Sequence, residues 1–279
     1  MGDIRPGPPQ LRPGRAFAHT TGASGSGSPH RSDSRPPQTP RGGRPSDPIG
    51  RPGTTPPVPG RPAHFPPFLL LGLPALLFAL ITWQVVADGP LLRADRRLSR
   101  ALVHPDGASK LLADLGGVQI AVPVLVAVMA YAALRARRAG EDRWWLPAVS
   151  AGAVMALVPA LVVPLKELTA RPGTPVMPPG SGYYPSGHTA TAAVAYGCAT
   201  LLLLPLTRAA AGRRALLAGC AAVNAGVGFG LVRHGYHWPL DVVASWCLCA
   251  VLLGLLRRLL SRSSRRRSSG TPSSRTGPS

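Results

Sequence analysis

The chain has 279 residues and a formal net charge of +20, from 31 Lys and Arg against 11 Asp and Glu. Much of this charge lies at the two ends: residues 1–62 hold nine Arg and three Asp, and residues 257–279 hold seven Arg and no acid. Basic ends that flank apolar segments are typical of cytoplasmic tails attracted to anionic lipid. We therefore expect membrane lipids, and no nucleic acid, as partners.

The N-terminal arm has a composition that disfavours folding. Residues 1–62 contain fifteen prolines and one aromatic residue. Such a segment buries too little apolar surface to offset the entropy lost on ordering. We predict a disordered arm over residues 1–62, a helical membrane domain over residues 63–258 and a disordered Ser/Arg-rich tail over residues 259–279. The oligomeric state stays open.

Six apolar runs lie between these ends, and about 20 apolar residues suffice to cross a hydrocarbon core of ~30 Å. The sequence therefore predicts an all-α polytopic membrane protein with six transmembrane helices, at residues 68–87, 117–134, 145–163, 189–206, 215–231 and 240–256. Residues 91–114 mix leucine with arginine, which suits an interfacial helix broken at Pro105, Asp106 and Gly107.

The loop charges predict an orientation. With the N-terminus inside, the inner segments are the arm, residues 135–143, residues 207–214 and the tail, and each is more positive than any outer segment. The positive-inside rule then places both termini in the cytoplasm of a multi-pass protein of the cell membrane. It also places three polar clusters together on the extracytoplasmic side, at residues 166–172, 185–188 and 233–241.

Two of these clusters suggest specific chemistry. Ser186 and Gly187 precede a predicted helix, whose free N–H groups and dipole favour an anion, and His188 adds a proton donor or acceptor. His237 and Asp241 are four apart, and Pro239 fits a first helical turn, so both should lie on one face. A carboxylate can orient such an imidazole for nucleophilic or base catalysis. A His–Asp pair that only caps the helix is the alternative.

Cations outnumber acids in the three clusters. Lys166 and the neighbouring arginines would repel a divalent metal, and they suit an anionic substrate instead. Phosphoryl transfer needs charge stabilisation and positioning above all. One histidine could attack phosphorus while the other protonates the leaving oxygen. We expect no metal and no cofactor.

Over about residues 66–256 the sequence resembles the type 2 phosphatidic acid phosphatase (PAP2) superfamily of six-helix membrane lipid phosphatases. Pro185-Ser186-Gly187-His188 matches its second signature, His237-x-x-x-Asp241 matches the end of its third, and Lys166 matches the start of its first. The resemblance implies that His237 is the nucleophile of a phosphohistidine intermediate, oriented by Asp241, and that His188 is the general acid. It also implies a phosphate site, formed by Lys166, Ser186, Gly187 and, from shifted positions, Arg171 and Arg233.

Two departures from the signatures leave an alternative open. Four residues separate Lys166 from Arg171, where the family usually has six, and Gly230-Leu231 occupies the slot of the usual Ser-Arg pair. The resemblance still predicts a phosphatase for a lipid phosphate monoester or diphosphate, such as a prenyl diphosphate or a phosphatidic-acid-like lipid. A catalytically weak or inactive lipid-phosphate-binding protein on the same fold is the alternative, and a transporter is disfavoured because no mid-span ionisable groups are found.

Overall fold

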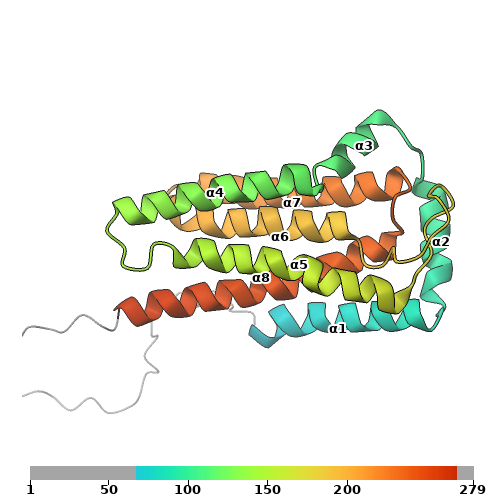
Figure 1. Cartoon of the computed structure of the whole chain (residues 1–279), viewed down its shortest axis with the longest axis horizontal. Helices are drawn as coiled ribbons and strands as arrows, with labels where there is room; N and C mark the ends of the chain where they lie inside the picture. Colours follow the sequence, from blue (N-terminus) through green and yellow to red (C-terminus); the bar gives the residue numbers. More distant parts are fainter. Residues whose placement is uncertain (1–66, 269–279) are drawn as a thin grey trace, which may run out of the picture. The chain divides into compact units, whose positions relative to one another are not determined.

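The computed structural model describes residues 67–268, with side chains over residues 71–261. The predicted disordered arm lies outside the described residues. Between residues 67 and 268 the regular secondary structure is entirely helical (Figure 1), which confirms the all-α prediction. The helices are α1 (Pro67–Val86), α2 (Leu91–Leu102), α3 (Gly107–Asp114), α4 (Val118–Arg138), α5 (Leu146–Thr169), α6 (Gly187–Leu203), the short 3-10 turn η1 (Leu204–Leu206), α7 (Ala210–Arg233) and α8 (Pro239–Ser268).

Five helices are long and apolar enough to cross a membrane: α4, α5, α6 with η1, α7 and the part of α8 up to Ser261. A sixth span is possible from α1 and α2 if this pair, bent by 91°, counts as one span. The polytopic membrane prediction is therefore confirmed, with the first span as its least regular member. At the other end, α8 continues to Ser268, past the domain boundary predicted at residue 258.

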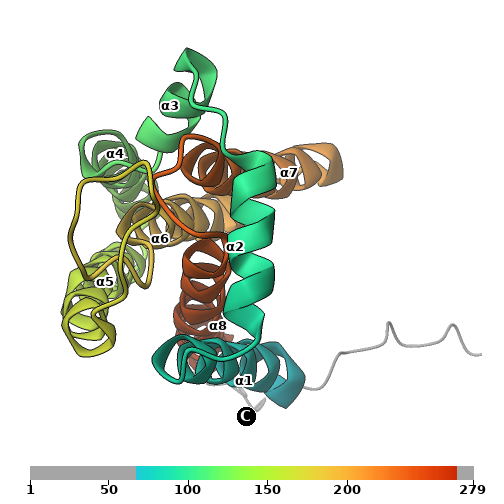
Figure 2. The ribbon, with the colours of Figure 1, turned by 90° about the vertical axis from the view of Figure 1, so that its right-hand side faces the viewer.

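The predicted interfacial segment forms two helices, α2 and α3, which break where the sequence indicated. Asp106 is the N-cap of α3: its Oδ1 accepts the Ser109 N–H at 2.6 Å, and the Asp106 N–H donates to Ser109 Oγ at 3.1 Å. This capping box starts a new helix directly after the break. In Figure 2, α2 lies across the ends of the long helices, in contact with α1, α7 and α8.

Helix α6 is the centre of the bundle, in contact with α4, α5, α7 and α8 (Figure 2). It is the most buried of the spans, and its inward residues are mostly small, such as Ala190, Ala195 and Cys198. Small side chains let helix backbones approach closely, which stabilises packing inside a membrane. The first turn of α6 is therefore held firmly at the end of the bundle that also carries α2 and α3.

Helix α3 packs against α7 at Gly230. A Cβ atom added there would lie 2.7 Å from the Ala113 N and from the Leu112 Cβ. This close approach explains why glycine stands in a slot where the signature usually has serine.

Candidate active site

The three polar clusters meet at one end of the bundle. They come from the last turn of α5, the first turn of α6 and the turn between α7 and α8. Together they line a polar pocket of about 520 Å³. Its charged and aromatic lining residues are Asp114, Lys166, Tyr183, His188, Tyr236 and His237. His188 and His237 follow Lys166 by 22 and 71 positions in the sequence, and all three residues line the same cavity.

His237 and Asp241 are paired as their spacing indicated. His237 Nδ1 lies 3.1 Å from Asp241 Oδ2, and the Trp238 N–H donates to the same oxygen at 3.1 Å. The Asp241 side chain is fully buried, and that of His237 is 9% exposed. When Nδ1–H donates to the carboxylate, Nε2 carries the free lone pair of the ring. The ring of Tyr183 meets the imidazole edge-on, with centroids 6.1 Å apart, which restricts its orientation.

Arg171 is buried between two carboxylates. Its Nη1 pairs with Asp241 Oδ1, and its Nη2 donates to Asp95 Oδ2 at 2.5 Å. The guanidinium also lies over the Trp238 ring, 5.6 Å from its centroid. Arg171 does not line the polar pocket. Its guanidinium therefore binds Asp241 and Asp95 and not a group inside the pocket.

Asp95 was missed by the sequence reasoning. It lies on α2, is 3% exposed, and accepts the N–H of Leu240 at 2.9 Å through its second oxygen. It therefore joins α2 to both Arg171 and the first turn of α8. A signal was present in the sequence: Asp95 shares the helical spacing of Leu92 and Ser99, which are the other two buried residues of α2.

Ser186 caps α6. Its Oγ accepts the Thr189 N–H at 3.3 Å and the Thr189 hydroxyl at 3.0 Å, and the residue is fully buried. The N–H groups of Gly187 and His188 lie in the first turn, where a helix offers them no partner. Ser186 is thus the N-cap of α6. The N–H groups of Gly187 and His188 are the donors available to an anion.

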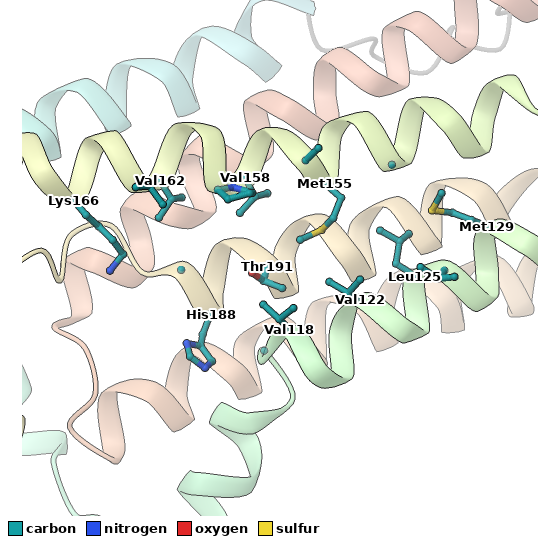
Figure 3. A pocket seen from close by; sticks show the side chains of 17 residues that line it. Val118, Val122, Leu125, Met129, Met155, Val158, Val162, Lys166, His188 and Thr191 are labelled. Atoms are coloured by element: carbon teal, nitrogen blue, oxygen red, sulfur yellow. The ribbon is translucent and has the colours of Figure 1, made fainter.

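Lys166 stands at the junction of two cavities. Its Nζ donates to the Gly182 carbonyl at 2.7 Å, and the half-buried side chain lines the polar pocket. Lys166 and His188 also line a second, apolar cavity of about 630 Å³ (Figure 3). The apolar walls come from α4 and α5 and include Val118, Val122, Leu125, Met129, Met155, Val158 and Val162.

Arg233 is not brought to the pocket. Its Nε and Nη2 both lie 2.9 Å from Asp106 Oδ2, on the half-exposed outer side of α3. The hydrogen bond from the Ser109 backbone, assisted by Arg233, lowers the pKa of Asp106 from 3.8 to about 2. The neighbouring His234 has its Nδ1 3.1 Å from Ser109 Oγ. The predicted role of Arg233 as a phosphate ligand therefore finds no support in its position.

The slot of the signature's other arginine holds Leu231. This side chain is fully buried and lines the polar pocket. Lys166 is then the one cation lining the pocket among the residues that the structure describes. Over the same residues no three His, Cys, Asp or Glu side chains gather as a metal site.

Comparisons with known proteins show what the chain is similar to. The sequence pattern of the PAP2 superfamily matches residues 147–265. A transmembrane PAP2-type phosphatidylglycerolphosphate phosphatase from Bacillus subtilis has a similar structure, with a TM-score of 0.56 and 22% identity, covering 71% of this chain and 96% of that one. A search of curated proteins found no match. Residues 147–265 are therefore similar to the PAP2 superfamily, and the chain shares the helical fold of the Bacillus subtilis protein.

Proposed function

We propose that this protein is an integral membrane phosphatase that hydrolyses a lipid phosphate monoester or diphosphate. The observation that carries the proposal is the junction of an apolar cavity with a polar pocket at Lys166 and His188. A molecule with a long apolar chain and a terminal phosphate has the same two parts. The apolar cavity would hold the start of the chain, and the polar pocket would hold the phosphate.

In the proposed reaction, Nε2 of His237 attacks phosphorus while the bond from phosphorus to the leaving oxygen breaks. His188 gives its proton to that oxygen. A water molecule, deprotonated by His188, then attacks the phosphohistidine, so that the P–N bond breaks and inorganic phosphate leaves. Lys166 and the N–H groups of Gly187 and His188 stabilise the charge on the phosphoryl oxygens.

Asp241 would hold His237 in the tautomer that leaves Nε2 free for attack. The Asp241 carboxylate, which contacts His237, is held in place by its buried ion pair with Arg171. The Arg171 guanidinium is held in turn by its buried ion pair with Asp95. In this scheme Arg171 and Asp95 act as positioning residues, because neither lines the pocket.

We further propose that the site faces the extracytoplasmic side. The loops rich in arginine, at residues 135–143 and 207–214, lie at the end of the bundle opposite α2 and α3 (Figure 1). The positive-inside rule supports a cytoplasmic position for those loops and for both termini.

A prenyl diphosphate suits an outer-face site. Phosphatidylglycerol phosphate, from the name of the Bacillus subtilis protein, and phosphatidic acid belong to the same chemical class.

The test is phosphate release by the purified full-length protein in detergent, over a panel of undecaprenyl diphosphate, phosphatidylglycerol phosphate and phosphatidic acid. We expect turnover of at least one lipid by the wild type and none by His237→Ala. A matched control is His104→Ala, which removes an exposed histidine outside the pocket. Turnover by His237→Ala equal to that of the control would refute the phosphohistidine mechanism.

A second function is favoured by Leu231. An apolar side chain in the pocket, together with an Arg171 that two carboxylates neutralise, leaves little positive charge for a transition state. This observation fits a lipid-phosphate-binding protein with weak or no catalysis. Retained binding of phosphatidic acid, with no phosphate release from any lipid of the panel, would identify that function.

A further inference from the structure

We propose that the arginine face of α2 is a binding site for the phosphate group of an anionic phospholipid, separate from the catalytic pocket. A groove of about 640 Å³ lies between this face and residues 174–176. No residue lines both the groove and the polar pocket. The groove lining consists of Arg93, Arg96, Arg97, Ser99, Arg100, Val103, Thr174, Pro175, Val176 and Trp238.

The four arginines form one continuous stripe. Arg93, Arg96, Arg97 and Arg100 follow the spacing of three and four residues that places side chains on one helix face, and all four are exposed. Like charges at this spacing destabilise a helix. A bound anion would remove this repulsion, and guanidinium groups match phosphate oxygens in bidentate geometry.

Little of this charge is neutralised within the protein. Among the described residues, the one carboxylate that pairs with the stripe is Asp88, 3.7 Å from Arg96 and 79% exposed. Asp95, on the same helix, faces inward and is engaged by Arg171. The stripe therefore presents three arginines with no ion pair in the described part of the chain.

The surroundings of the stripe favour a lipid as the source of the phosphate. Leu91 and Leu98, on another side of α2, are 40% and 50% exposed, so the helix carries apolar side chains at its surface as well as arginines. Val176, 52% exposed, and the ring of Trp238 form the apolar part of the groove. Arginine, leucine and tryptophan gather in this way where a helix lies in the headgroup region of a bilayer. On the proposed outer face, where arginine is normally depleted, such a stripe needs a function of its own.

The test measures binding of dihexanoyl phosphatidylglycerol to the full-length protein in a neutral detergent, by calorimetry, against dihexanoyl phosphatidylcholine and inorganic phosphate. Phosphatidylglycerol is a phosphodiester and not a substrate of the proposed phosphatase, so this result is independent of activity. The groove variant is Arg93→Gln/Arg97→Gln/Arg100→Gln. The charge-matched control, at the other end of the bundle, is Arg135→Gln/Arg138→Gln/Arg214→Gln, and Lys166→Gln reports binding in the catalytic pocket.

We expect the wild type to prefer phosphatidylglycerol to phosphatidylcholine. The groove variant should weaken this binding on the order of 100-fold, since each arginine near an anionic lipid contributes roughly fivefold. The single variant Arg97→Glu should weaken it at least about tenfold. The control triple and Lys166→Gln should change it less than about threefold.

Three results would overturn the proposal. Equal weakening in the groove and control triples would mean a diffuse charge effect. Loss of binding in Lys166→Gln alone would place the phosphate in the catalytic pocket. Inorganic phosphate binding as tightly as phosphatidylglycerol would overturn the assignment to a lipid.

Discussion

Replacement of Arg171 by Gln should destabilise the protein strongly. Arg171 is 5% exposed, and its two partners, Asp95 and Asp241, have fully buried side chains. Without the guanidinium, both carboxylates stay buried with no counter-ion. Breaking a buried ion pair in this way costs about 3–5 kcal/mol. At roughly 2–4 °C per kcal/mol for a domain of this size, the Tm should fall by about 6–20 °C.

The assay is thermal unfolding of the purified protein in detergent without phosphate. The control is Arg233→Gln, because the ion pair of Arg233 with Asp106 is exposed and such pairs contribute little. The double variant Asp95→Asn/Arg171→Gln should recover part of the loss, since one of the two buried charges is then absent. A Tm of Arg171→Gln within about 2 °C of wild type, with a loss of phosphate affinity, would refute this reasoning and support the phosphate-ligand role predicted from the sequence.

Three further predictions follow from named contacts. Gly230→Ala should lower the free energy of unfolding by about 1–3 kcal/mol, because its Cβ would overlap α3; Gly219→Ala on the same helix, where a Cβ meets nothing within 4 Å, should not lower the Tm. In a single turnover, His188→Ala should slow release of the alcohol from a lipid phosphate about 10²–10⁴-fold and release of nitrophenolate from p-nitrophenyl phosphate far less, because nitrophenolate leaves without a proton; equal losses in this first step would exclude a general-acid role. The pKa of Asp106 falls from 3.8 to about 2 on folding. The contribution of its carboxylate to folding stability is therefore complete above the pKa of the unfolded state, and it is lost as the pH drops through the pKa of the folded state. The Tm difference between wild type and Asp106→Asn should therefore be constant above about pH 5 and shrink towards pH 2, and a difference that does not vary with pH would contradict this.

The helices could be predicted from the sequence because their causes are local. Apolar runs of the right length predicted the spans, and Pro105, Asp106 and Gly107 predicted the break between α2 and α3. The pairing of His237 with Asp241 was equally accessible, since residues four apart on a helix are neighbours. The cap formed by Ser186 follows from the same local geometry.

The ion-pair partners of Arg171 and Arg233 could not be predicted from local sequence spacing. Arg171 pairs with Asp95, 76 positions away, and Arg233 pairs with Asp106, 127 positions away. Both acids belong to the segment after α1, and their positions depend on the 91° turn that lays α2 across the end of the bundle. A spacing rule cannot anticipate contacts that arise from such a turn.

The sequence by itself determined the helical membrane fold, the histidines and the acid of the candidate site, and their gathering at one end of the bundle. Only the tertiary structure decided which cations remain available to a phosphate: Lys166 lines the pocket, whereas Arg171 and Arg233 are held by carboxylates. The physical reason is that an arginine binds whichever anion the packing brings within reach. In this protein, packing of α2 and α3 against the bundle end supplies those anions from within the chain.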